Sequence, residues 1–147
     1  MFTVSLKQTR ANDLANVLNN IVPSALKTLK ELNLVSKSAD RFTDAVATFL
    51  AVMAEIKNGT AEFNAKIDKD STKEEIEAVK IEANIALKSV FERQEAIADE
   101  IVSVELSDEQ VEFLRANFMD LIAKSFKTVG YALEIAEALE VDLDKAE

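Results

Sequence analysis

Two short runs alternate between apolar and polar residues, whereas the rest of the chain does not. Residues 2–6 ("FTVSL") and 101–106 ("IVSVEL") have the period of two that is typical of a β-strand with one buried face. Each run is too short to be stable alone, but two such strands can pair. The pattern therefore predicts a small two-stranded antiparallel sheet. Its buried residues are expected to be Phe2, Val4, Leu6, Val102, Val104 and Leu106.

Elsewhere apolar residues recur at helical spacing. The first helical pattern runs from Leu14 to Leu32, and Pro23 is expected to break it near residues 20–22. We expect "NLVSKSAD" (33–40) to form a turn and Ser38 to cap a second helix that stops at Gly59. A short helix would then begin after Thr60.

Two capping boxes indicate where later helices begin. Ser71 and Glu74 follow the linker "DKDS" and start a long helix that reaches about Glu100. Ser107 and Gln110 start a final helix whose buried stripe is expected to continue through Phe118, Phe126 and Val129 to Leu133. These patterns predict a mainly α fold. We expect a single helical domain over residues 1–147, built as a bundle of four to five helices with the small sheet 2–6 and 101–106.

The stretches that begin at Val4 and Val104 resemble each other at an offset of one hundred residues. Both contain an alternating run followed by helical spacing. Our hypothesis is that the two strands lie side by side and set the register of the two helices that follow. The identical pairs are Val4/Val104, Leu6/Leu106, Leu14/Leu114, Lys27/Lys127 and Thr28/Thr128.

The residue types needed for most catalytic and metal sites are missing. The chain has no histidine and no cysteine, which excludes histidine-assisted nucleophiles, thiolate metal sites and disulfides. Two isolated glycines cannot build a phosphate-binding loop. We therefore predict no catalytic residue, no cofactor-binding residue, no metal site and no enzymatic activity.

The net charge of −10 is concentrated in residues 61–147, which hold ten Lys/Arg and twenty-two Asp/Glu. So acidic a chain is repelled by nucleic acids and anionic membranes, and we expect neither as a partner. No apolar run reaches the roughly 18 residues of a membrane span, and the N-terminus lacks the order of a signal peptide. These features predict a cytoplasmic or virion-associated protein.

Acidic residues gather at the end of the long helix and along the final helix. The simplest interpretation is a solvated face, and the alternative is a docking surface for a basic protein. Phe113 and Met119 are the best candidates for exposed apolar contacts, although Phe113 could equally widen the buried face. The candidate partner-binding residues are Glu92, Glu95, Asp99, Glu105, Glu112, Phe113, Met119, Glu134 and Glu137.

The order "VLNNIVPSALKTLKELN", a long charged helical middle and "EIVSVELSDEQVEFL" resembles small helical accessory proteins encoded in bacteriophage genomes. The matching features are Pro23 within the first helix and the late acidic strand 101–106. The final helix of this chain extends further than in that group. The resemblance implies a virion-associated or host-interacting role and supplies no catalytic residue.

Together these observations predict a non-enzymatic protein-interaction module. It would act as a structural or assembly accessory, or as a modulator of a host protein, through an acidic or apolar helical face. A small export or assembly chaperone and an acidic nucleic-acid mimic are the alternatives. Exposed stripes on the long helices could also pair between copies of the chain.

Overall fold

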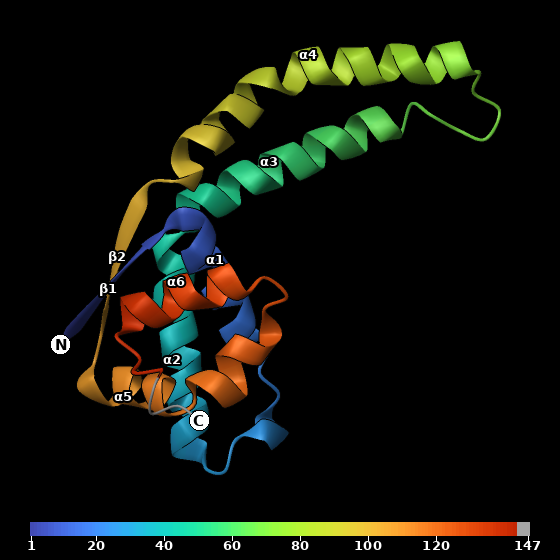
Figure 1. Cartoon of the computed structure of the whole chain (residues 1–147). Helices are drawn as coiled ribbons and strands as arrows, with labels where there is room; N and C mark the ends of the chain where they lie inside the picture. Colours follow the sequence, from blue (N-terminus) through green and yellow to red (C-terminus); the bar gives the residue numbers. More distant parts are fainter. Residues whose placement is uncertain (144–147) are drawn as a thin grey trace. The chain divides into compact units, whose positions relative to one another are not determined.

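The computed structural model describes residues 1–143, which are mainly helical and fall into two compact units (Figure 1). The first, which we call the split unit, combines Met1–Val46 with the chain from Glu100 onward. The second, the hairpin unit, is formed by Ala47–Asp99. The hairpin unit therefore interrupts the split unit in the sequence.

The split unit contains the same series of elements twice. In each series a strand leads into a helix, a short irregular helical segment follows, and a second helix ends the series. The first series is β1 (Phe2–Lys7), α1 (Gln8–Asn19), the 3-10 turn η1 (Pro23–Ala25) and α2 (Leu29–Ala45). The second is β2 (Ile101–Leu106), α5 (Asp108–Ala116), the π-helical segment η2 (Phe118–Ile122), the 3-10 turn η3 (Ala123–Ser125) and α6 (Val129–Leu139).

The predicted antiparallel sheet is confirmed, because β1 and β2 pair along their whole length (Figure 1). Val4 lies opposite Val104, and the pairing is symmetric about this pair: Thr3 faces Glu105, and Ser5 faces Ser103. Adding one hundred to each residue number of β1 gives the equivalent residue of β2, and exchanging equivalent residues leaves the pairing unchanged. The sheet thus has an internal two-fold axis at its two central valines.

The helices follow the same two-fold relation. The first helices start at residues 8 and 108, the 3-10 turns at 23 and 123, and the second helices at 29 and 129. The second helix of each series contacts the strand of the other: α2 contacts β2, and α6 contacts β1. We call residues 2–45 the first repeat and residues 101–143 the second repeat.

Equivalent positions of the two repeats form the core of the split unit. Both members of each pair are buried, so each repeat contributes the same side-chain positions to one core. The buried pairs are Val4/Val104, Leu6/Leu106, Ala11/Val111, Leu14/Leu114, Leu18/Phe118, Val35/Ile135 and Ala39/Leu139.

The beginning of the second helix differs from the expectation. The break near Pro23 is confirmed, but α2 starts at Leu29 and runs through the predicted turn at 33–40. Thr28 caps it by accepting a hydrogen bond from the Glu31 backbone N–H at 3.1 Å. Ser38 is buried within the helix, and its hydroxyl donates to the Leu34 carbonyl at 2.7 Å.

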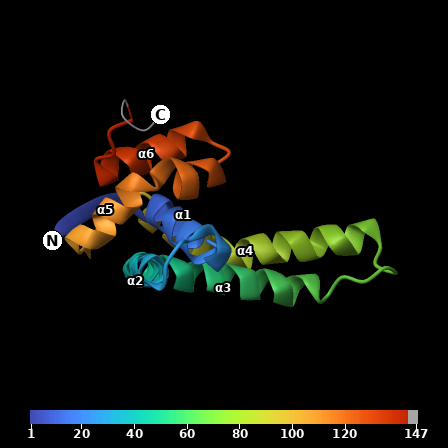
Figure 2. The same ribbon diagram turned by 90° about the horizontal axis from the view of Figure 1, so that it is seen from below.

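The hairpin unit consists of α3 (Ala47–Asn64) and α4 (Lys73–Ala98), which lie side by side (Figure 2). Val52, Leu87 and Val90 form its small core. The predicted stop at Gly59 and the separate helix after Thr60 are wrong, because both residues lie inside α3. An ideal Cβ on Gly59 would lie 2.5 Å from Leu87 Cδ2, so a glycine here leaves room for the Leu87 side chain against α3.

Two further helix boundaries refine the expectation. The long helix α4 is confirmed, although Thr72 caps it rather than Ser71. The capping box of Ser107 and Gln110 at the start of α5 is also confirmed. The single final helix is wrong, since α5 ends before Asn117 and α6 begins only at Val129. Residues 1–143 therefore contain six α-helices, more than the four to five expected.

Candidate functional site

The acidic candidates are divided between the two units. Glu92, Glu95 and Asp99 lie at the end of α4 in the hairpin unit, and all three are exposed. The other four acidic candidates are exposed on three elements of the split unit. They are Glu105 on β2, Glu112 on α5, and Glu134 and Glu137 on α6.

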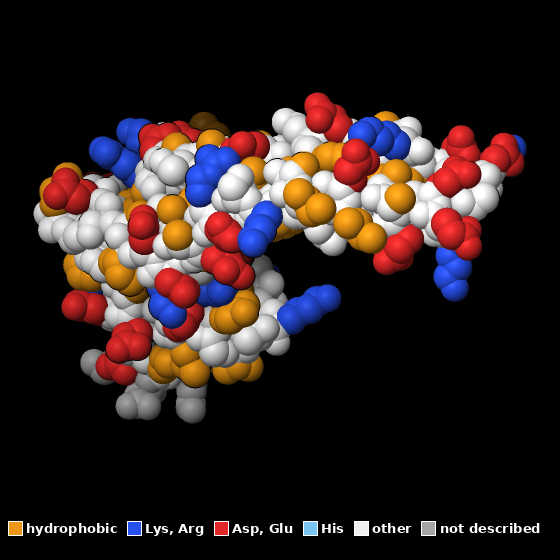
Figure 3. Space-filling view, turned by 90° about the horizontal axis from the view of Figure 1, so that it is seen from above, with side chains coloured by type: hydrophobic (Ala, Val, Ile, Leu, Met, Phe, Trp, Pro, Cys, Tyr) orange, Lys and Arg blue, Asp and Glu red, His pale blue; other side chains and the backbone are white. Residues whose placement is uncertain are grey.

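The face drawn in Figure 3 shows acidic side chains interspersed with basic and apolar ones rather than gathered in a continuous acidic surface. Several carboxylates are also paired with cations: Glu134 Oε2 lies 3.2 Å from Arg10 Nε, and Glu55 Oε1 lies 2.8 Å from Arg93 Nη2. A solvated acidic face and a docking surface for a basic protein both stay predictions for these residues.

Arg10 connects α1 to α6 in the split unit. It is largely buried, lies 2.6 Å from Asp13 Oδ2, and places its guanidinium carbon 3.4 Å from the centre of the Tyr131 ring. Burial raises the pKa of Asp13; Arg10 opposes this shift, and the nearby charge of Glu134 adds to it. This polar cluster positions the first turns of α6.

Arg115 anchors the other end of α6. Its Nε donates to the Leu139 carbonyl at 2.6 Å, where the helix ends, and its guanidinium lies over the Phe2 ring at 4.7 Å. A cation at a helix C-terminus also interacts favourably with the helix dipole. Two arginines therefore fix α6, so the surface that α6 presents is well defined.

An apolar groove of about 420 Å³ opens on the second repeat. Met119 is 47% exposed, Val129 71% and Leu133 49%, which is unusual for neighbouring large apolar side chains. The predicted contact residue Met119 belongs to this groove. Phe113 is half-buried and does not line it. The lining residues are Phe118, Met119, Ala123, Phe126, Val129, Ala132, Leu133 and Leu143.

The equivalent surface of the first repeat is polar at three of these positions. Asn19 stands where the second repeat has Met119, Asn33 where it has Leu133, and Thr43 where it has Leu143. Asn19 and Thr43 also bond to each other, since Asn19 Nδ2 donates to Thr43 Oγ1 at 3.3 Å. The apolar character of the groove is therefore a property of the second repeat and not a requirement of the repeated fold.

Sequence reasoning missed Val129 and Leu133 as surface residues because it placed both on the buried stripe of a continuous final helix. The break after α5 changes which face of α6 is buried: Ile135, Ala136 and Leu139 point inward instead. A comparison of the two repeats could have identified the groove, because some positions that are polar in the first repeat are apolar in the second.

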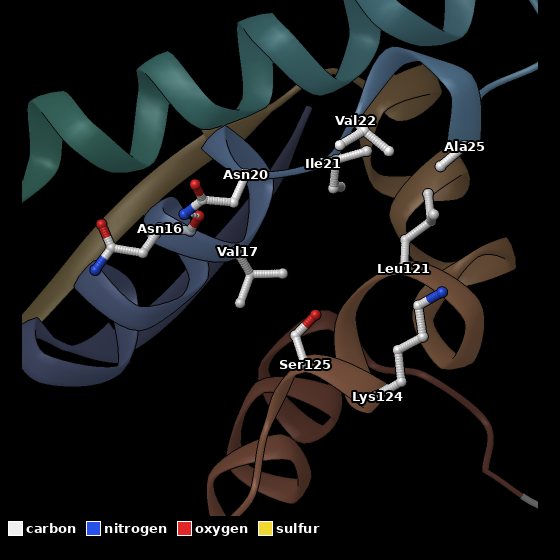
Figure 4. A pocket seen from close by; sticks show the side chains of 9 residues that line it. All are labelled: Asn16, Val17, Asn20, Ile21, Val22, Ala25, Leu121, Lys124 and Ser125. Carbon is white, nitrogen blue, oxygen red and sulfur yellow. Dashed lines mark hydrogen bonds between the residues drawn. The ribbon is translucent and has the colours of Figure 1, made fainter.

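A second hollow, of about 350 Å³, lies between the two repeats of the split unit (Figure 4). The two connecting segments that face each other there are equivalent: Ile21 corresponds to Leu121 and Ala25 to Ser125. Its wall is partly apolar, and Lys124 and Ser125 add polar groups on one side. The lining residues are Asn16, Val17, Asn20, Ile21, Val22, Ala25, Leu121, Lys124 and Ser125.

Within residues 1–143 no three acidic side chains come close enough together to hold a metal ion. None of the helices in this range combines the length and the apolar character that crossing a membrane requires. Comparisons with protein-family models, with curated proteins and with solved structures found no match to this chain.

Proposed function

We propose that the chain is a non-enzymatic protein-binding module whose apolar groove holds a helical segment of a partner protein. The observation that carries the proposal is the exposure of Met119, Val129 and Leu133 on a rigidly anchored α6. Full burial of such a side chain contributes about 1.5–3 kcal/mol, so covering the three yields roughly half that amount from Met119 and Leu133 and somewhat more from Val129, which is 71% exposed.

The charge of the split unit indicates the kind of partner. Residues 1–46 and 100–147 together carry ten Lys/Arg and sixteen Asp/Glu. A partner helix with an apolar face and basic flanks would fit the groove and be attracted by the surrounding charge. Such a role suits an assembly accessory or a modulator of a host protein, as the resemblance to phage accessory proteins implies.

The first repeat supplies a variant that tests the groove with little risk to the fold. Met119→Asn, Leu133→Asn and Leu143→Thr together install the residues that occupy the equivalent positions of the first repeat. The matched control is Leu29→Asn, because Leu29 corresponds to Val129 but lies outside the groove and is already 85% exposed.

The partner is first identified by placing a photo-crosslinking amino acid at position 133 in cells that produce the chain, with position 33 as the control site. The affinity of the purified partner is then measured for each variant. We expect the triple variant to weaken binding roughly tenfold or more, with the control unchanged. Equal affinities for the wild type and the triple variant, or equal crosslinking from position 33, would refute the proposal.

A small assembly chaperone is the second candidate, favoured by the same exposed groove. A chaperone would hold a segment that is unfolded without it and release that segment on assembly. Circular dichroism of the isolated partner segment separates the two functions, since only a chaperone client should lack helical structure before binding.

A further inference from the structure

We propose that the hollow between the repeats is a second site, which binds a carboxylate carrying a short aliphatic group. It is separate from the groove, because the two share no lining residue. The inference is therefore independent of the protein-binding function proposed above. The repeated segments 21–25 and 121–125 form its two sides.

The lining of this hollow includes a positive charge, whereas the chain as a whole is acidic. The chain carries 27 acidic and 17 basic residues, yet the nine residues that line the hollow include one cation, Lys124, and no carboxylate. Within residues 1–143 Lys124 has no ion-pair partner. Lys124 is exposed, so its ammonium is free to pair with an anionic ligand whose apolar part contacts the neighbouring walls.

Polar groups line both sides of the hollow, Asn16 and Asn20 on the first repeat and Lys124 and Ser125 on the second, and the charged group is on the second-repeat side. In Figure 4 Lys124 and Ser125 both come from the second repeat, and the Ser125 hydroxyl points toward the open space. An ammonium donates to a carboxylate oxygen, and a hydroxyl can donate to the other. The equivalent residues of the first repeat, Ser24 and Ala25, supply no charge, so the carboxylate would bind on the second-repeat side.

The remaining walls suit an aliphatic group. Val17, Ile21 and Leu121 are half-buried and face the hollow together with Val22 (Figure 4). Asn20 lies at the edge and is already engaged, since its Nδ2 donates to the Asn16 carbonyl at 2.6 Å. The volume of about 350 Å³ is at the small end of the range for ligand sites, roughly 300–1,000 Å³, which limits the ligand to a short chain.

Such a carboxylate could come from a free acid or from the C-terminal residue of a peptide. The test titrates the ¹⁵N-labelled full chain with 4-methylpentanoate and with acetyl-Ala-Ala-Leu, and each probe has its carboxamide as a neutral control. We expect saturable shifts of the amide signals of Val22, Leu121 and Ser125 with at least one acid and none with the amides. The acid that binds more tightly shows whether the natural ligand is a free acid or the C-terminal residue of a peptide.

Lys124→Gln is the decisive variant, and Lys37→Gln on α2 is its matched control. A hydrogen bond between charged groups contributes substantially to binding affinity. Lys124→Gln should therefore lower the affinity for the tighter-binding acid roughly tenfold, and Lys37→Gln should leave it unchanged. Both lysines are exposed, so both variants should fold. Unchanged affinity in Lys124→Gln, equal shifts from acids and amides, or no saturable shift with any probe would overturn the proposal.

Discussion

Replacing Gly59 by alanine tests whether the two helices of the hairpin unit are as closely packed as the structure indicates. The added Cβ would lie 2.5 Å from Leu87 Cδ2, whereas carbon atoms in contact are about 3.5–4.0 Å apart. Leu87 would have to move by more than about 1 Å within a core that it shares with Val52 and Val90.

Two opposing terms decide the sign of the effect. Alanine within a helix is favoured over glycine by about 1 kcal/mol. Forcing an extra carbon into a packed core costs about 1–3 kcal/mol. Because the contact involves a core side chain, we expect Gly59→Ala to lower the free energy of unfolding by about 1 kcal/mol. Gly130→Ala makes the same chemical change in the first turn of α6, where no heavy atom lies within 4 Å of the new Cβ.

The assay is urea unfolding of the full chain followed by circular dichroism, with hydrogen exchange of the α3 amides to report on the hairpin unit alone. Gly130→Ala should stabilise the chain by up to about 1 kcal/mol, since it meets no steric cost. If Gly59→Ala stabilised the hairpin unit by the same amount, the close approach of Gly59 and Leu87 would have no energetic consequence, and the reasoning would be wrong.

Three further changes test other contacts. Arg115→Ala should lower the unfolding free energy by about 1–2 kcal/mol, since the Leu139 carbonyl loses its donor, and Arg115→Lys should restore only part of this in urea unfolding. Ser107→Ala should cost about 1 kcal/mol in the same assay, because it removes the cap of α5. Burial raises the pKa of Asp13, so its contribution to stability is full below the unfolded pKa and is lost as pH rises through the folded pKa. The stability of the wild type relative to Asp13→Asn should therefore fall as the pH rises above the ordinary carboxyl pKa of 3.8, and a rise would contradict this.

The parts of the fold that could be predicted are those where the local sequence pattern favours one kind of element and no other. Alternation over residues 2–6 and 101–106 has only one structural interpretation, and the Ser107 capping box stands just before a helical pattern. The start of α2 was ambiguous, because Thr28 and Ser38 can both cap a helix. Tertiary packing decided it: Ser38 is fully buried, and so it cannot serve as an exposed cap.

The groove could not be predicted from the hydrophobic periodicity of the sequence. Its existence depends on the break between α5 and α6, and no proline or glycine marks Asn117 as a helix end. The Asn117 side chain adds a second donor at this helix end, since its Nδ2 donates to the Phe113 carbonyl at 3.0 Å and its backbone N–H donates to the same oxygen at 3.1 Å. Helical spacing continues through the break, so Val129 and Leu133 were expected on a buried face that the folded chain does not build.

The two-fold register around Val4 and Val104 has a consequence for how such a chain can arise and change. Two identical short chains could pair in the same way as a homodimer. Both copies would then have the same sequence and therefore the same surface. Joining them in one polypeptide removes that constraint, because a substitution then alters one half alone. Asn19 and Asn33 in one half, at the positions where the other half has Met119 and Leu133, are the kind of difference that this freedom permits.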